Sequence, residues 1–172
     1  VLVNPIGLED WKVKVPYKTV DEWFAEELKK TKDGIVAYQQ ENYYAGAWTP
    51  EYAQWADVLY RWTLSPDYPR VAWNAALTYD MIYTQPVVYE FPNVRSRTLL
   101  IIGQRDRTAL GKAAVAESVH ATMGNYPELG RATAQAIPGA RLVELDGVGH
   151  LPHVEAFDRF IEPLLAFLGA NA

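Results

Sequence analysis

Cysteine is absent from the 172-residue sequence, which excludes disulfide bonds and thiol catalysis within it and leaves the cellular compartment open. No hydrophobic run approaches the roughly 18 residues that a membrane-spanning helix needs. Basic residues are not in excess, since the formal net charge is −5, and this gives no reason to expect nucleic acid or an anionic membrane as a partner. With 49% hydrophobic and 22% charged residues, the composition is typical of a globular domain with its own core.

An apolar segment from Val1 to Val3, followed by Asn4 and Pro5, predicts a strand that starts at the first residue of the sequence. Neither an initiator methionine nor a signal peptide precedes it. Chain termini usually lie exposed, not inside a buried strand. We therefore expect a further part of the protein upstream of Val1, with a short edge strand at a true terminus as the alternative.

Aromatic residues are concentrated in the first half of the chain. All six Trp lie at or before Trp73, and most of the eleven Tyr precede residue 90. The second half is rich in aliphatic residues instead. This shift in composition suggests two structural regions with different roles.

Residues 16–84 have the pattern of amphipathic helices. Thr19 and Glu22 have the spacing of a capping box, and Thr49 followed by Pro50 marks another helix start. The sequence predicts helices over residues 20–32, 35–44, 50–60 and 70–83, with a break at Gly34.

The pattern changes after residue 97. Residues 98–102 form a continuous apolar run that stops at Gly103, as expected of a strand buried on both faces of a parallel sheet. Residues 141–145 predict a second strand. The predicted helices of this half cover residues 112–121, 128–137 and 156–168, the last of them containing Pro163, which should kink it. Strands that alternate with helices imply right-handed crossovers and a parallel sheet.

Two polar residues follow these predicted strands directly. Asp106 lies just past the first strand, and His150 lies in a glycine-bearing loop after the second. Functional groups gather at the carboxyl ends of strands in open α/β sheets, so we expect the two side chains to be close in space. A carboxylate that holds an imidazole is the acid–base part of a nucleophilic triad, which makes both residues catalytic candidates.

Four segments resemble those of lidded α/β hydrolases, in the order expected for that family. Residues 99–107 (LLIIGQRDR) resemble the acid motif after strand seven, and residues 149–155 (GHLPHVE) resemble the histidine loop. Residues 1–7 (VLVNPIG) are similar to strand six and the loop into the cap. Residues 137–141 (IPGAR) match the usual entry to strand eight. The resemblance therefore runs along the whole chain.

The resemblance implies an α/β fold: the C-terminal part of an α/β-hydrolase sheet, strands six to eight, with an inserted helical cap. Residues 1–10 would form a strand and loop, 11–94 the cap or lid, and 95–172 the C-terminal part of the hydrolase core. Strands one to five, the oxyanion-hole loop and the G-x-S-x-G nucleophile elbow are absent from the sequence. The three serines, Ser65, Ser96 and Ser118, do not stand in an elbow context.

The function that the resemblance implies is hydrolysis of a small hydrophobic ester or related acyl compound. His150 would be the general base and Asp106 its orienting acid, with a nucleophile upstream of this chain and no metal or organic cofactor. One alternative is an epoxide hydrolase or haloalkane dehalogenase with an aspartate nucleophile. Another is a non-catalytic binding protein or inactive fragment. We expect the chain alone to be inactive, and its partners to be the small-molecule substrate and either the N-terminal half of the same enzyme or a second copy pairing through residues 1–4.

Other ionisable residues give weaker candidates. Glu9 and Asp10 follow the first predicted strand, where some relatives place the triad acid. His150, His153 and Asp146 are the right residue types for a metal site, but three ligands without a fourth make this the minor interpretation. His120 is expected on a helix surface.

Two tyrosines of the predicted cap are pocket candidates. Tyr79 and Tyr83 are four residues apart, so they share a helix face. They are expected either to line the substrate pocket or to pack in the core of the cap.

Overall fold

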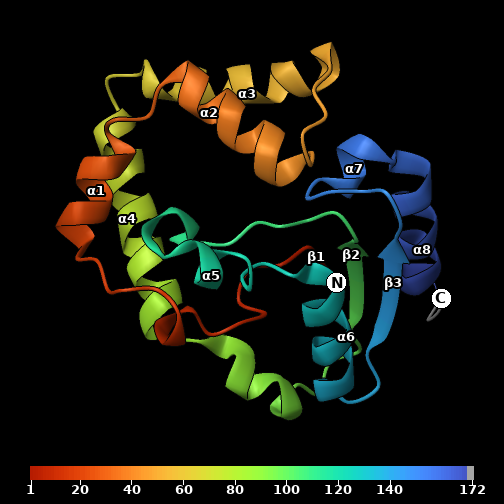
Figure 1. The fold of residues 1–172 in the computed structure, drawn as a ribbon. Helices are drawn as coiled ribbons and strands as arrows, with labels where there is room; N and C mark the ends of the chain where they lie inside the picture. Colours follow the sequence, from red (N-terminus) through yellow and green to blue (C-terminus); the bar gives the residue numbers. More distant parts are fainter. Residues whose placement is uncertain (170–172) are drawn as a thin grey trace.

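Three parallel strands form the sheet of the computed structural model, which describes residues 1–169. They are β1 (Leu2–Val3), β2 (Leu99–Gly103) and β3 (Arg141–Leu145), in the spatial order β1-β2-β3. Leu2 pairs with Leu100 in the register, and Leu99 pairs with Arg141. The predicted parallel sheet and both predicted C-terminal strands are thereby confirmed (Figure 1).

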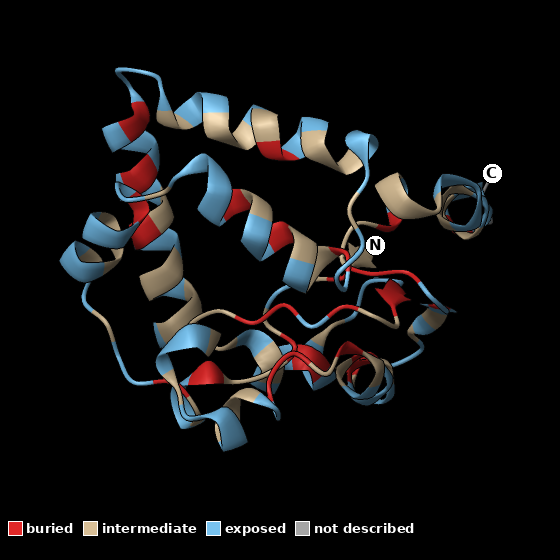
Figure 2. Cartoon of the chain, turned by 45° about the horizontal axis from the view of Figure 1, so that its top comes forward, coloured by how far each residue is buried: buried red, intermediate tan, exposed pale blue. Residues whose placement is uncertain are grey.

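Strand β2 is the centre of the core, because all five of its residues are buried. Leu100 and Ile102 face a cluster that includes Tyr126 from helix α6 (Tyr126–Ala136). Leu99 and Ile101 face a second cluster that includes Phe167 from helix α8 (Phe157–Gly169). Successive side chains of a strand point to opposite faces of the sheet, so the apolar run of β2 fills both layers. Figure 2 shows in red where the buried residues lie along the chain.

The aromatic-rich half of the chain is helical. It contains α1 (Val20–Glu27), α2 (Lys32–Tyr38), a π-helical turn η2 (Gln39–Tyr43), α3 (Pro50–Thr63) and α4 (Tyr68–Thr84). Helix α4 packs against α1 through pairs such as Trp23 with Tyr79, whose ring centroids are 4.9 Å apart. Helix α2 lies beyond the carboxyl ends of the strands (Figure 1). The helices therefore stand over the edge of the sheet where polar loops emerge.

Two predicted helix starts are confirmed, but α2 and α4 begin at Lys32 and Tyr68, before the predicted residues 35 and 70, and the predicted break at Gly34 is wrong. Thr19 and Glu22 form the capping box, and Thr49 caps the helix that begins at Pro50. Helix α1 ends at Glu27, before the predicted boundary, and the side chain of Thr31 caps a new helix by accepting from Gly34 N. Gly34 therefore lies inside the first turn of α2, because a capping threonine three residues earlier outweighs its low helix propensity.

The helix predicted over residues 112–121 is also wrong. That segment contains a short 3-10 helix, η4 (Lys112–Ala114), and a four-residue helix, α5 (Glu117–His120). Val115 and Ala116 between them have extended backbone, with ψ near 161° and 151°, so no continuous helix can form.

The remaining elements are short, with the exception of α8. The 3-10 helices η1 (Trp11–Val13) and η3 (Val87–Asn93) flank the helical half, and α7 (Pro152–Glu155) precedes α8. Helix α8 runs past Pro163 to Gly169. Within residues 1–169, no helix is long and apolar enough to cross a bilayer.

We predict that Gly103→Ala destabilises the protein by about 3 kcal/mol or more, the upper end of the usual cost of overpacking. A Cβ atom at residue 103 would lie 2.0 Å from the carbonyl oxygen of Gly149 and 2.8 Å from that of Val148, and neither backbone group can rotate away. Urea denaturation gives the free energy of unfolding. Gly34→Ala is the matched control, since its Cβ would meet only the Thr31 hydroxyl at 3.2 Å. Equal stability of the two variants would contradict the close approach at Gly103.

Candidate active site

The structure brings Asp106 and His150 together, although 44 residues separate them. His150 Nδ1 lies 2.7 Å from Asp106 Oδ2. Asp106 follows β2 and His150 lies in the loop after β3, so the adjacent parallel strands deliver both side chains to one edge of the sheet. A carboxylate oxygen can only accept, so Nδ1 carries the proton and Nε2 is left as the basic nitrogen.

Asp106 has no exposed surface, and Thr108 provides the other hydrogen bonds of its carboxylate. Both the backbone N–H of Thr108, at 2.8 Å, and its hydroxyl, at 2.9 Å, donate to Asp106 Oδ1. The Thr108 hydroxyl oxygen also lies 3.3 Å from His150 Nδ1. One carboxylate oxygen is thus fixed by Thr108 while the other holds the imidazole. This role of Thr108 was missed from the sequence; its position two residues after the aspartate is the only signal there.

The loop that carries His150 is held from two sides. Glu155 accepts hydrogen bonds from the backbone N–H groups of Gly149 and Leu151. Burial of Glu155 raises the pKa of its carboxyl group, and these two donors oppose the rise. On the other side the N–H of His150 donates to the carbonyl of Tyr43 in η2, at 2.8 Å. The helical half therefore contacts the histidine backbone directly.

Tyr43 also covers the imidazole ring. The two ring centroids are 4.4 Å apart with a 36° angle between the planes. Tyr38 packs edge-on against Tyr43 at 5.6 Å. Both phenols line the cavity described next, and neither hydroxyl is hydrogen-bonded to another residue in the described part of the chain. Sequence reasoning missed these two residues, because nothing in the helical pattern shows that a π-helical turn docks on the histidine loop.

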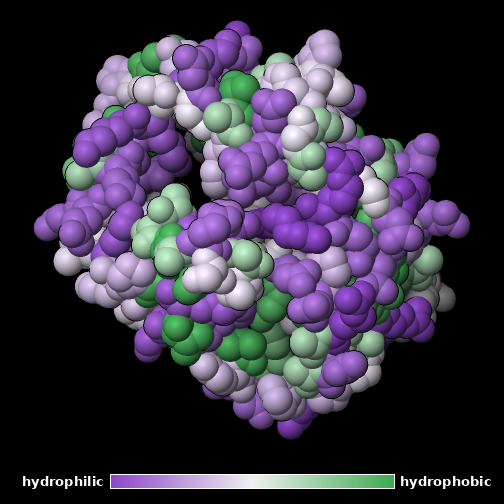
Figure 3. Space-filling model, in the orientation of Figure 1, coloured by the Kyte–Doolittle hydropathy of each residue, from purple (hydrophilic) through white to green (hydrophobic). Residues whose placement is uncertain are grey.

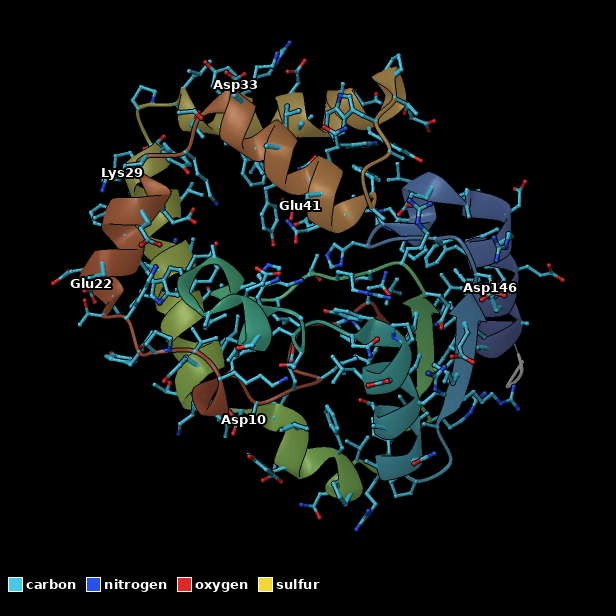
Figure 4. All side chains as sticks on the ribbon, viewed as in Figure 1. Asp10, Glu22, Lys29, Asp33, Glu41 and Asp146 are labelled. Carbon is cyan, nitrogen blue, oxygen red and sulfur yellow. The ribbon has the colours of Figure 1, made fainter. Side chains whose placement is uncertain are left out.

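A cavity of about 1120 Å³ lies between the helices and the loops at the strand ends. His150 and Thr108 line its floor together with Tyr126, and the aromatic side chains of Tyr43 and Tyr38 line the wall next to His150. Charged residues from the end of α1, including Glu27, Lys29 and Lys30, line the far side. Figure 3 shows the molecule hollowed beneath α2, with hydrophilic residues on the α1 side of the opening. Glu41, labelled in Figure 4 near the end of the α2–η2 segment, is also one of the residues that line the cavity.

The two tyrosines proposed for the pocket lie in different places. Tyr79 lines the cavity, and its hydroxyl donates to Glu27 Oε1 at 2.9 Å. Burial raises the pKa of the Tyr79 phenol, and the charge of Glu27 raises it further. The hydroxyl therefore keeps its proton and donates it in the hydrogen bond to Glu27. Tyr83 is not among the residues lining this cavity: its hydroxyl donates to the carbonyl of Val15, and its ring packs against Tyr17. Tyr83 faces the base of the helical half instead.

The alternative acids make contacts away from His150. Glu9 pairs with Lys14 at 2.8 Å and accepts from the N–H of Gly124. Asp10 caps η1 and accepts from the hydroxyl of Tyr89. Both carboxylates are occupied in holding the loop that follows β1.

The residues considered for metal binding do not gather. Asp146 is exposed in the turn after β3 (Figure 4), and the ring of His153 packs against Phe160. His120 lies on α5, is partly exposed and lines the cavity, 4.0 Å from Glu117. Across residues 1–169 no three His, Asp or Glu side chains are placed to hold one metal ion.

Comparison with known proteins gives structural matches only. Neither a protein-family model nor a curated protein matches the chain. A probable hydrolytic enzyme from Pseudomonas aeruginosa PAO1 is 48% identical, with a TM-score of 0.92 over 97% of this chain and 55% of that chain.

Two more distant structures have the same fold. The α/β hydrolase MGS-M2 from a Medee basin deep-sea metagenome is 17% identical, with a TM-score of 0.59 over 97% of this chain and 54% of its own. The enol-lactonase from Burkholderia xenovorans LB400 is 21% identical, with a TM-score of 0.53 over 97% and 54%. The chain spans about half the length of each of these proteins. The chain therefore has the fold of the C-terminal part of an α/β hydrolase.

Proposed function

We propose that this chain supplies the acid–base part of the active site of a hydrolase that cleaves small ester or related acyl substrates. The observation that carries the proposal is the 2.7 Å contact between Asp106 and His150 on the floor of a cavity. A buried carboxylate that fixes the tautomer of a partly exposed imidazole is the arrangement a general base needs.

In the proposed reaction, a hydroxyl nucleophile from outside residues 1–172 attacks the substrate carbonyl carbon. His150 Nε2 takes the hydroxyl proton as the new bond forms. The resulting imidazolium, held by Asp106, then gives this proton to the leaving alcohol as the ester bond breaks. Water next attacks the acyl-enzyme, with its proton passing to Nε2 and on to the departing nucleophile. Asp106 stays ionised throughout and stabilises the imidazolium.

The structural neighbours favour an acyl substrate over other classes. One is described as an enol-lactonase, another as an N-acyl homoserine lactone degrading enzyme and a third as a serine hydrolase. Lactones are cyclic esters, and a serine nucleophile fits acyl transfer. The aromatic wall next to His150 supports a hydrophobic group beside the scissile bond.

Residues 11–94 are proposed to act as the cap of this enzyme, over a core formed by residues 1–10 and 95–169. The last three residues of the expected core, 170–172, lie outside the described part of the chain. Support comes from the position of the cavity between the two groups of residues. The cap is tied to the core by Arg105, whose guanidinium donates to the carbonyls of Tyr44 and Gly147.

The missing nucleophile is proposed to come from the remaining half of the enzyme. Among the described residues, β1 pairs with β2 alone, so one side of β1 is open to a further strand. An open edge with apolar residues favours pairing with another segment. We propose the N-terminal half of the same protein as its partner, with self-association of two copies as the competing outcome.

We predict that Asp106→Asn in the full-length protein keeps the fold and lowers kcat about 10⁴-fold, as expected when an amide favours the wrong imidazole tautomer. Steady-state kinetics on a short-chain ester, with circular dichroism as the check on folding, measures this. Asp146→Asn is the control, because Asp146 is exposed and does not line the cavity. A folded Asp106→Asn protein with wild-type kcat removes Asp106 from the mechanism.

Residues 1–172 alone are predicted to hydrolyse esters no faster than buffer, since they hold the base without a nucleophile. Turnover of p-nitrophenyl acetate by this chain and by the full-length protein makes the comparison. Size-exclusion chromatography with light scattering of the chain alone reports whether β1 pairs two copies. If the isolated chain turns over the ester and His150→Ala abolishes that activity, the nucleophile lies within it and the proposal is wrong.

The full-length protein is predicted to prefer short acyl esters and lactones to epoxides and haloalkanes by at least about 100-fold in kcat/KM, because the chemistry requires attack at a carbonyl. A substrate panel tests the preference. Turnover confined to epoxides or haloalkanes would indicate an aspartate nucleophile. Binding without turnover of any class would favour a non-catalytic protein.

A further inference from the structure

Asn4 occupies the point where the ends of all three strands meet. It follows β1, it is 4% exposed, and its own N–H donates to the carbonyl of Ile101 at 3.0 Å. Its φ angle is +37°, a conformation that asparagine tolerates better than most residues with a side chain. The mechanism proposed above does not use this residue.

The side-chain amide of Asn4 joins the histidine loop to the end of β2. Its Nδ2 donates to the carbonyls of Gly149, at 2.8 Å, and His150, at 2.9 Å. Its Oδ1 accepts from the N–H of Gly103 at 2.8 Å. Both amide hydrogens and one oxygen lone pair are therefore used by backbone groups within one buried junction.

The same junction leads to the acid. Gly103 is the last residue of β2, and its carbonyl accepts from the N–H of Asp106 at 3.2 Å. The Asn4 amide thus links the backbone of His150 with the turn that carries Asp106. Only an amide presents two donors and an acceptor in this geometry: a carboxylate has no donor, and an aliphatic side chain has neither.

We propose that Asn4 is a positioning residue that sets the distance between His150 and Asp106. The expected effect of Asn4 on the rate rests on the proposed function. Its expected effect on the distance between His150 and Asp106 rests on geometry alone. Asn4 makes no side-chain bond to the imidazole, so its effect passes through the backbone of the histidine loop. Displacement of a catalytic group by about 1 Å costs on the order of 100-fold in rate.

Two variants of the full-length protein separate this role from a contribution to folding. Asn4→Asp keeps the shape and the acceptor for Gly103 but turns an oxygen toward two carbonyls. Asn4→Gly removes the amide without adding charge and tolerates the positive φ. Asn74→Asp is the control, since Asn74 is exposed on α4 and does not line the cavity.

The first measurement is kcat and KM for p-nitrophenyl acetate, per folded molecule. For Asn4→Asp and Asn4→Gly we expect kcat to fall about 100-fold with KM changed less than about threefold, whereas Asn74→Asp matches wild type. A merely structural role would lower the folded fraction but leave kcat per folded molecule unchanged. Wild-type kcat in either folded Asn4 variant overturns the proposal.

The second measurement needs no activity. The proton on His150 Nδ1 is hydrogen-bonded to a carboxylate, so it gives a ¹H NMR resonance at low field. The loss of this resonance in His150→Ala assigns it. This resonance is expected to be lost or moved upfield in folded Asn4 variants, even if the wild type hydrolyses no ester and the proposed function fails. An unchanged resonance overturns the proposal. If neither variant folds, Asn4 is required for folding, and the positioning role is also rejected.

Discussion

The complete burial of the Asp106 carboxylate is the constraint on which the rest of the site depends. An ionised carboxylate without contact to water is stable only if donors surround it. Three are present: the backbone N–H of Thr108, its hydroxyl, and His150 Nδ1. Because one of these donors belongs to the loop after β3, satisfying the buried charge requires that loop to close onto the end of β2. Glycine at position 103 permits the approach, since a Cβ there would collide with the carbonyl of Gly149.

The helical half participates in the same closure. His150 donates its backbone N–H to Tyr43, whose ring also lies against the imidazole. Arg105 donates to backbone carbonyls of both the helical half and the turn that precedes the histidine loop. A movement of η2 relative to the core would therefore disturb the histidine itself, so the proposed cap both encloses the cavity and supports the base.

Local patterns allowed much of the fold to be predicted. The apolar run of β2 and the capping box at Thr19 are signals carried by neighbouring residues, and both are confirmed. The pairing of Asp106 with His150 was expected because parallel strands align their ends. The helix predicted over 112–121 failed because two extended residues interrupt it, which composition does not show. Tyr43 contacts the distant His150, and Asn4 acts through contacts across 99 to 146 residues, so no local pattern encodes either role. Thr108 instead bonds to Asp106, two residues before it, and that spacing is its one local signal.

We propose that His150, held by Asp106, activates a nucleophile for acyl transfer. Labelling of the full-length protein with a fluorophosphonate tests it most directly, because fluoride leaves only when an activated hydroxyl attacks phosphorus. We expect one phosphonyl group per molecule, attached outside residues 1–172, at a rate that His150→Ala reduces by at least about 1000-fold. Labelling at the same rate in wild type and His150→Ala, or an ester-hydrolysing protein that is never labelled, would contradict it.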